Sequence, residues 1–252
     1  MAKIIAVANQ KGGVGKTTTS VNLAACLAAK RKKVLLVDCD PQGNASSGYG
    51  INKSALEQTI YHVLIDNADV QAVIQKTEFK VDVLPANIDL AGAEVELVAA
   101  ISRETRLKKA LAVVKENYDY ILIDCPPSLG LLTLNSLAAA DSVLIPIQCE
   151  FYALEGVAQL MKTIELVRSN LNADLTIEGV VMTMYDSRTK LAEQVVAEVR
   201  SSFETTVYKT MIPRTVRLSE APSFGQPIIY YDKRSKGAEV YMQLAKEVIS
   251  RG

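Results

Sequence analysis

The 252-residue sequence lacks several features that mark particular classes of protein. No apolar run reaches the roughly 18 residues that a membrane-spanning helix needs, and no signal-peptide core follows Met1. Positive and negative side chains balance at 28 each, so no overall field attracts or repels nucleic acid. These absences predict a soluble, cytoplasmic protein with no membrane partner, in which any basic surface is local.

Histidine and cysteine are also scarce. The only histidine is His62, which excludes a histidine-based metal site and favours a structural or surface role for this side chain. The four cysteines are widely separated and form no C-x-x-C pair: Cys26, Cys39, Cys125 and Cys149. We therefore expect buried thiols with neither a disulfide nor a zinc ion.

The most informative segment runs from residue 9 to residue 18 and reads NQKGGVGKTT. Its ending fits the phosphate-loop pattern G-x-x-x-x-G-K-[ST], in which backbone N–H groups hold phosphate oxygens. Gln10 stands where the opening glycine belongs, and a second lysine, Lys11, follows it. One nucleotide needs one lysine on its β- and γ-phosphates, and Lys16 supplies it. The second lysine indicates a task beyond holding a single nucleotide.

The flanks of this loop have the right character. Lys3–Ala8 is a short apolar run typical of a buried parallel strand, and apolar residues recur at helical spacing from Val21 to Ala28. The order strand, glycine loop, helix places a helix N-terminus at the anion site. A chance glycine-rich turn is the alternative, and the flanks and the GK[ST] ending argue against it.

Apolar runs alternate with helical patterns along the whole chain. Further strands are expected at Val34–Asp38, Val81–Leu84, Tyr120–Asp124, Ser142–Ile147, Ile177–Thr183, Val207–Ile212 and Ile228–Tyr230. Helices are expected at Ala55–Ile65, Glu104–Asn117, Leu129–Ala139, Ala153–Ser169, Lys190–Phe203 and Gly237–Ser250. The alternation predicts an α/β fold, a mostly parallel twisted sheet with helices on both faces, in a single domain over residues 1–252.

The last helical stretch, Gly237–Ser250, has two interpretations. Val240, Leu244 and Val248 recur every four residues, as in a helix that anchors to a membrane surface. Such anchors usually carry many lysines or arginines and large apolar side chains, whereas charges balance here. We therefore expect this helix to pack on the sheet.

Carboxylates follow two of the expected strands, where ligands of parallel sheets bind. Asp124 ends an apolar run and can hold the water shell of a metal ion that also takes the hydroxyl of Thr17; the alternative is a turn or helix cap. Asp38 and Asp40 lie two residues apart, and either can approach an attacking water. Spacing alone does not choose between them, and a turn is also compatible with Asp-Pro and Gly-Asn.

Three segments together resemble the deviant Walker A ATPases, and within them the ParA/Soj partitioning family. They are Lys11–Thr18, Val37–Asn44 and Ile123–Ser128. Segments at 91–94, 150–156 and 212–223 are also similar to that family, so the resemblance covers essentially the whole chain. It implies a P-loop NTPase fold, ATP and Mg²⁺ as cofactors, and weak ATP hydrolysis.

The resemblance assigns roles to the loop. Lys11 matches the signature lysine that crosses a dimer interface to the partner's ATP, and Lys16 matches the lysine on the phosphates of its own subunit. Thr17 matches the magnesium ligand, and Thr18 matches the contact to the α-phosphate. The remaining nucleotide-binding loop positions are Gly12, Gly13, Val14 and Gly15.

The resemblance also assigns roles outside the loop. Asp40 matches the carboxylate that positions the hydrolytic water, and Asp124 matches the Walker B aspartate. Pro213 and Thr215 match positions near the adenine. Many family members have asparagine where Thr215 stands, so only a backbone contact to the base is expected there.

A basic stretch lies near the C-terminus. Residues 200–236 contain four more cations than carboxylates. The seven cations are Arg200, Lys209, Arg214, Arg217, Lys233, Arg234 and Lys236, and the three carboxylates are Glu204, Glu220 and Asp232. Clustered cations are sufficient for sequence-independent phosphate contacts, and a solvated charged face is the alternative. Arg188 and Arg217 match positions that the family uses for nonspecific contact with double-stranded DNA.

The implied function is an ATP-dependent homodimer that partitions chromosomes or plasmids. It coats nonspecific DNA at the nucleoid and hydrolyses ATP when a ParB-type partner stimulates it. Two rivals share the fold: a membrane-cycling ATPase that resembles MinD, and a metabolic ATP-dependent enzyme such as an amidoligase. The first requires an amphipathic C-terminal anchor, and the second requires a substrate pocket.

Overall fold

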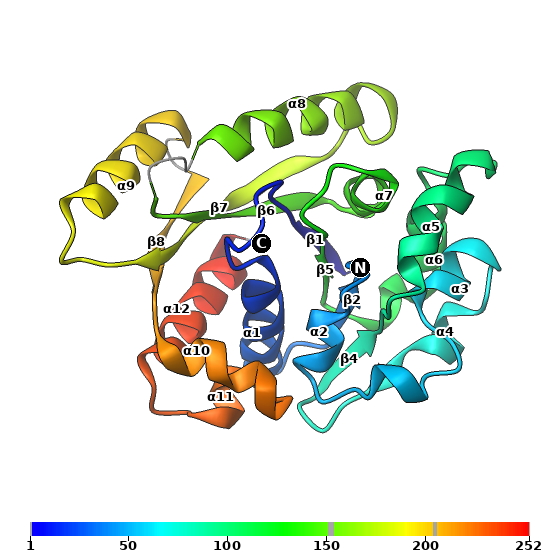
Figure 1. The fold of residues 1–252 in the computed structure, drawn as a ribbon, viewed down its shortest axis with the longest axis horizontal. Coiled ribbons are helices and arrows are strands. Elements are labelled where there is room, and N and C mark those ends of the chain that lie inside the picture. Colours follow the sequence, from blue (N-terminus) through cyan, green and yellow to red (C-terminus); the bar gives the residue numbers. More distant parts are fainter. Residues whose placement is uncertain (1, 151–153, 204–205, 252) are drawn as a thin grey trace.

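The computed structural model describes residues 2–150, 154–203 and 206–251, and it holds one eight-stranded sheet in the order β3-β4-β2-β5-β1-β6-β7-β8 (Figure 1). All neighbouring strands are parallel except β3 and β4, which form an antiparallel pair. The strands are β1 Lys3–Val7, β2 Val34–Asp38, β3 Gln75–Lys76, β4 Val81–Leu84, β5 Tyr120–Asp124, β6 Ser142–Gln148, β7 Thr176–Tyr185 and β8 Val207–Pro213.

The register of the central strands aligns their carboxyl ends. Asp124 at the end of β5 is the register partner of Val7 at the end of β1 and of Asp38 at the end of β2. Every residue of β2 and β5 is buried, as expected of strands covered on both faces. The loops after β1, β2 and β5 therefore meet at one edge of the sheet, where parallel sheets bind their ligands.

Helices cover the two faces of the sheet with separate apolar cores. One face carries α1 (Lys16–Ala29) and α12 (Lys236–Arg251) side by side, with α2 (Asn44–Ser47), α10 (Val216–Glu220) and α11 (Ile228–Tyr231) (Figure 1). The other face carries α3 (Ile60–Ile65), α4 (Val70–Val73), α5 (Leu90–Glu96), α6 (Arg106–Val114), α7 (Leu131–Ala139), α8 (Glu155–Asn170) and α9 (Lys190–Phe203). The predicted α/β architecture with helices on both faces is confirmed.

The apolar stripe of α12 is turned inward. Val240, Leu244 and Val248 are buried in the core that α12 shares with α1 and the sheet. The helix therefore packs on the sheet, as the sequence analysis expected. Within the described residues, no helix combines the length and the apolar character needed to cross a membrane.

Two of the expected elements are wrong. The apolar run Ile228–Tyr230 is not a strand but part of α11, because Pro227 precedes it and the side-chain oxygen of Asn22 accepts the N–H of Ile228 at 2.7 Å. The expected helix Ala55–Ile65 is broken: Lys53–Ala55 forms a 3₁₀ turn, and α3 begins only after Thr59. Thr59 and His62 form a reciprocal capping box there, which gives His62 a structural role.

Other expected boundaries differ by a few residues. The helix expected at Glu104–Asn117 is α6 followed by a 3₁₀ turn at Lys115–Asn117. The helix expected at Leu129–Ala139 is α7, which begins at residue 131. Ala153 lies outside the described residues, so the start of the helix expected at Ala153–Ser169 is not described; α8 runs over Glu155–Asn170. The family-like segment at 150–156 also falls partly outside them. All four cysteines are buried free thiols, as predicted.

Candidate functional site

The loop between β1 and α1 is fixed at both sides of its turn. The side chain of Asn9 donates to the Pro146 carbonyl oxygen at 2.7 Å and accepts the Lys11 N–H at 3.0 Å. The Thr183 hydroxyl donates to the Val14 carbonyl oxygen at 2.8 Å. Gly13 and Gly15 have φ angles of 74° and 85°, which a residue with a side chain rarely adopts. The glycines of the motif therefore allow a tight loop that is held in place ahead of α1, and the N-terminus of a helix after such a loop favours an anion.

Lys16 lies inside this loop. Its side-chain Nζ donates to the carbonyl oxygen of Lys11 at 3.0 Å, and the residue is buried. Burial lowers the pKa of Lys16, while the nearby Asp124 carboxylate opposes that change. The ammonium group is thus held at the phosphate side of the loop by a contact that a phosphate oxygen can replace.

Thr17 and Asp124 form the predicted pair. The Thr17 hydroxyl donates to Oδ2 of Asp124 at 2.7 Å, and the Ser20 hydroxyl donates to Oδ1 at 2.8 Å. Burial, reinforced by the charge of Asp38, raises the pKa of Asp124 to about 7. A hydroxyl and a carboxylate are hard oxygen donors, and Mg²⁺ needs only one or two of these beside phosphates and water. The donor set fits a magnesium ion, and a nearby cation would favour the charged carboxylate.

Asp38 and Asp40, which spacing left equivalent, have different surroundings. Asp38 is fully buried, and its carboxylate accepts hydrogen bonds from the Ser46 N–H and hydroxyl at 2.8 and 2.7 Å and from the Asp40 N–H at 3.3 Å. Asp40 accepts one hydrogen bond, at Oδ1, from the Gln42 N–H at 2.9 Å. Asp38 therefore holds the loop in place, and within the described residues Oδ2 of Asp40 has no hydrogen-bond donor.

Lys11 forms an ion pair with a residue outside the loop. Its Nζ lies 3.6 Å from Oε2 of Glu150, whose other oxygen lies 3.8 Å from Nη2 of Arg214. The side chain of Lys11 is 33% exposed and that of Glu150 is 49% exposed. An ion pair this open and long contributes little stability, so Lys11 can exchange it for a stronger anion.

Pro213 and Thr215, the residues expected near an adenine, lie beside the phosphate loop. Both line a cavity of about 450 Å³ beside the phosphate loop, which Gly15 and Thr18 also line. The Thr215 hydroxyl accepts the Leu218 N–H at 3.3 Å and caps α10. This side chain is therefore already engaged within the protein.

Arg188 lies in a basic groove near the carboxyl ends of β7 and β8. The groove has a volume of about 580 Å³, and its charged lining consists of four cations and one carboxylate: Arg188, Lys209, Arg214, Lys236 and Asp186. Arg188 and Asp186 form a two-pronged ion pair with distances of 2.9 and 2.7 Å. The groove thus combines Arg188 with three cations of the basic stretch at residues 200–236.

Arg217 lies outside the residues that line this groove. Its Nη1 is 3.0 Å from Glu220, and its Nε is 3.6 Å from Asp232. Two of the three carboxylates counted in the basic stretch therefore pair with Arg217, and the third, Glu204, is outside the described residues. The side chain of Arg217 remains more than half exposed, so it is accessible to a phosphate.

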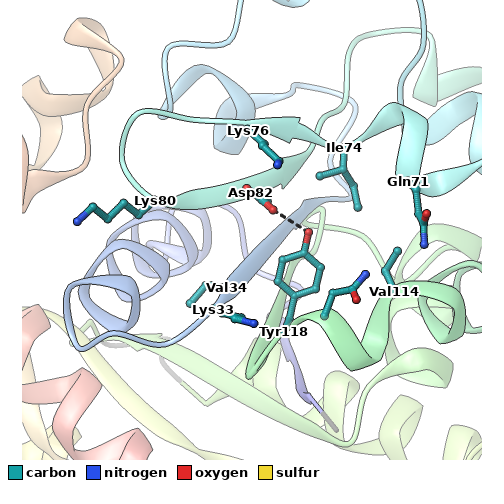
Figure 2. Close-up of a pocket in the computed structure, with 10 residues that line it drawn as sticks. Lys33, Val34, Gln71, Ile74, Lys76, Lys80, Asp82, Val114 and Tyr118 are labelled. Carbon is teal, nitrogen blue, oxygen red and sulfur yellow. Dashed lines mark hydrogen bonds between the residues drawn. The ribbon is translucent and has the colours of Figure 1, made fainter.

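A further cavity, of about 530 Å³, lies at the opposite edge of the sheet, at the amino end of β2. Three lysines and Asp82 line it, and Figure 2 shows the Tyr118 hydroxyl directed at the Asp82 carboxylate, with an O–O distance of 2.8 Å. Burial and this carboxylate raise the pKa of Tyr118. None of the predicted site residues lines this cavity, so the candidate site is the loop edge.

Sequence reasoning missed the residues that support the site. Asn9 and Thr183 hold the loop, Ser20 holds Asp124, and Ser46 holds Asp38. Ser20 lies one helical turn after Lys16, so its spacing was a usable signal. Thr183 lies far from the loop in sequence, and only the parallel pairing of β6 and β7 brings it there.

Comparisons with known proteins agree with this geometry. A family model described as an AAA domain matches residues 2–177. The chain is 65% identical over 253 residues to the sporulation initiation inhibitor protein Soj of Bacillus subtilis, covering 100% of both chains. It is 57% identical over 252 residues to the chromosome partitioning protein ParA of Myxococcus xanthus, covering 100% of this chain and 89% of that protein.

Among solved structures, the chain is similar to one described as cobyrinic acid a,c-diamide synthase from Mycobacterium smegmatis with bound ADP and magnesium. The TM-score is 0.88 and the identity 41%, over 99% of this chain and 94% of that one. Full-length identity to Soj and ParA, together with the P-loop fold and its second lysine, establishes the relationship. The chain belongs to the ParA/Soj family of partitioning ATPases.

Proposed function

We propose that residues 1–252 work as one ATPase domain that partitions chromosomes or plasmids as an ATP-controlled, DNA-binding homodimer. The observation that carries the proposal is the division between two lysines of one loop. Lys16 contacts the backbone of the loop itself, and Lys11 forms a weak ion pair with Glu150, outside the loop. One lysine serves the nucleotide of its own subunit, and the other is free for the nucleotide of a partner.

Binding of the nucleotide uses the groups nearest the loop. The backbone of Gly12–Gly15, Lys16 and Thr18 contact the phosphates, and the cavity beside Pro213 and Thr215 takes the adenine. Thr17 and Asp124 are the residues that would hold Mg²⁺, and a bound Mg²⁺ would neutralise charge on the phosphates. The hydrogen bond from Ser20 keeps the Asp124 carboxylate oriented.

Hydrolysis requires a water positioned for attack on the γ-phosphate. Asp40 performs this task, because its carboxylate is held at one oxygen by Gln42 and has its other oxygen available. Asp38 accepts three hydrogen bonds and serves as the anchor of that loop. The products are ADP and phosphate, and loss of the γ-phosphate weakens the dimer.

Dimerisation follows from charge. Two nucleotides held between two subunits concentrate negative charge in a poorly screened space. Lys11 of each copy leaves Glu150 and compensates the phosphates bound by the other copy, as an arginine finger does when supplied in trans. ATP therefore favours the dimer through a contact that a monomer does not make.

DNA binding uses the groove lined by Arg188, together with the exposed Arg217. Contacts of this kind recognise phosphates and carry no sequence information. One patch on a neutral protein binds weakly, and two patches on one dimer bind much more tightly. ATP thus controls DNA binding through dimerisation, and a ParB-type partner ends it by stimulating hydrolysis.

Both rivals have weaker support. A membrane-cycling ATPase needs an available amphipathic anchor, and the apolar stripe of α12 is buried against the sheet. The observation behind the amidoligase alternative is the similar Mycobacterium smegmatis structure, which is named as a cobyrinic acid a,c-diamide synthase. An amidoligase would couple ATP use to an acid acceptor and an amine, and nucleotide would not control its affinity for DNA.

The proposal is tested by DNA-binding titrations with ATP, ADP and no nucleotide, each at two salt concentrations. We expect tight binding only with ATP, with affinity that falls steeply as salt rises. Equal DNA binding in all three nucleotide states contradicts the proposal. Binding to anionic vesicles, measured in parallel, distinguishes the membrane-cycling alternative.

A further inference from the structure

An exposed apolar stripe runs along α5 and the 3₁₀ turn that follows it at Leu97–Ala99. Ile88, Ala91, Val95 and Val98, which we call the α5 stripe, recur at helical spacing and are all exposed. The three larger side chains are 58% to 74% exposed, and Ile101, just beyond the turn, is 87% exposed. The opposite face of the same helix is buried, so the segment is apolar on both sides.

The segment that carries the α5 stripe is acidic. Residues 88–101 contain Asp89, Glu94 and Glu96 and no lysine or arginine. The nearest cation in sequence, Arg103, donates to the Val98 carbonyl oxygen at 2.7 Å and is paired with Glu104 at 2.8 Å, so its charge is already compensated. An apolar surface with acidic borders complements a segment that carries cations beside apolar side chains.

Helix α5 is connected to the nucleotide site through Glu94. Its carboxylate accepts the N–H groups of Leu131 and Leu132 at 3.0 and 3.4 Å, at the start of α7. Gly130 allows this approach, because a Cβ built there would lie 2.5 Å from Oε1 of Glu94. The side chain of Glu94 therefore holds the end of the loop that begins at Asp124.

The same loop continues to the phosphate loop. The Thr133 hydroxyl in α7 donates to the Ser128 carbonyl oxygen at 2.6 Å, which fixes the loop to the helix. A Cβ built at Gly12 would contact Cβ of Pro127 at 4.0 Å, so the two loops lie against each other. A shift of α5 thus has a continuous path of contacts to the residues around Asp124 and the phosphates.

We infer that the α5 stripe is the docking surface for a partner segment with lysine or arginine beside apolar side chains, and that Glu94 transmits its binding to the ATPase site. This inference rests on the proposed function, in which a partner stimulates hydrolysis. Docking covers Val95 and Val98 and pairs the partner's cations with Asp89 and Glu96. It moves α5 and, through Glu94, the loop after Asp124. Glu94 is a positioning residue in this scheme.

The test measures binding and stimulation by the ParB-type protein from the same organism, with ATP present. The double variant Val95→Ser, Val98→Ser should weaken partner binding at least roughly tenfold, which corresponds to about 1.4 kcal/mol. Its basal ATP hydrolysis, its ATP-dependent dimerisation and its thermal unfolding should match the unmodified chain. Leu166→Ser is the matched control, because Leu166 on α8 is 64% exposed and lies on another helix.

A second variant tests the coupling. Glu94→Gln should bind the partner within about twofold of the unmodified chain while losing most of the stimulation, because a neutral amide holds the α7 N–H groups less strongly than a carboxylate does. Unchanged stimulation by Glu94→Gln overturns the coupling role. Unchanged partner affinity in the double valine variant overturns the docking surface.

Loss of ATP-dependent dimerisation in the double valine variant assigns the α5 stripe to a contact between copies of this chain and also overturns the inference. If the unmodified chain hydrolyses ATP but is neither bound nor stimulated by the ParB-type protein, the partner step of the proposed function fails first. That result is seen before any variant is compared, so the two failures are distinguishable.

Discussion

Replacement of Asp40 by alanine separates hydrolysis from every other step of the proposed cycle. The substitution removes one hydrogen bond in the folded protein, from the Gln42 N–H to Oδ1, at a cost of about 1 kcal/mol. It also removes a negative charge that raises the pKa of both Asp38 and Asp124, so part of that cost is recovered. The variant should therefore fold normally and bind ATP.

The effect on turnover should be much larger than the effect on stability. Loss of a group that positions and deprotonates the attacking water reduces the rate by roughly 10²- to 10⁴-fold. The assay measures phosphate release at saturating ATP and Mg²⁺. Light scattering on the same samples measures the dimer content. We expect a long-lived ATP dimer that hydrolyses little.

The neighbouring aspartate supplies the contrast. Asp38→Ala leaves the Ser46 N–H and hydroxyl without their buried acceptor, so it should lower the free energy of unfolding by at least roughly 3 kcal/mol. Asp40→Ala should instead leave the unfolding transition nearly unchanged. Turnover reduced less than tenfold in a well-folded Asp40→Ala protein refutes the assignment of the water to this carboxylate.

Three further outcomes are expected. Lys16→Ala should abolish ATP binding measured by calorimetry, because the ammonium group that contacts the loop backbone is lost, and near-normal affinity contradicts that role. Arg217→Glu should weaken DNA binding in mobility shifts while ATP-dependent dimerisation persists, and unchanged shifts argue against this part of the patch. Burial raises the pKa of Asp38 to about 6, above the value near 3.9 of an unfolded aspartate. The contribution of this pKa difference to the free energy of unfolding is complete below pH 4 and is lost as the pH rises through 6. Asp38→Asn lacks this titrating group. Between pH 4 and 7, the unmodified chain should therefore lose roughly 3 kcal/mol more unfolding free energy than Asp38→Asn does. Equal pH profiles for the two proteins contradict this sign.

The fold was predictable because its strands are short buried runs separated by clear helical patterns. The order strand, glycine loop, helix in residues 3–29 depends only on local sequence, and it agrees with the structure. The run at Ile228–Tyr230 was not predictable in this way, because a three-residue apolar segment fits a strand and a helix equally well. Its helical form depends on Asn22, which is distant in sequence.

The site was predictable as far as single residues carry recognisable chemistry. The motif placed Lys16 and Thr17, but spacing could not rank Asp38 and Asp40. Their difference comes from Ser46, whose side chain reaches back to Asp38 only once α2 forms. The ion pair of Lys11 is made with Glu150, which follows β6, and no local sequence pattern relates the two residues.

The proposed role of Lys11, to serve the ATP of another copy, can be measured in the dimer content of Lys11→Ala. The variant and the unmodified chain are compared at saturating ATP by size-exclusion chromatography with light scattering. We expect ATP binding within a few fold of normal and no ATP-dependent dimer. A Lys11→Ala protein that dimerises with ATP as fully as the unmodified chain contradicts this role.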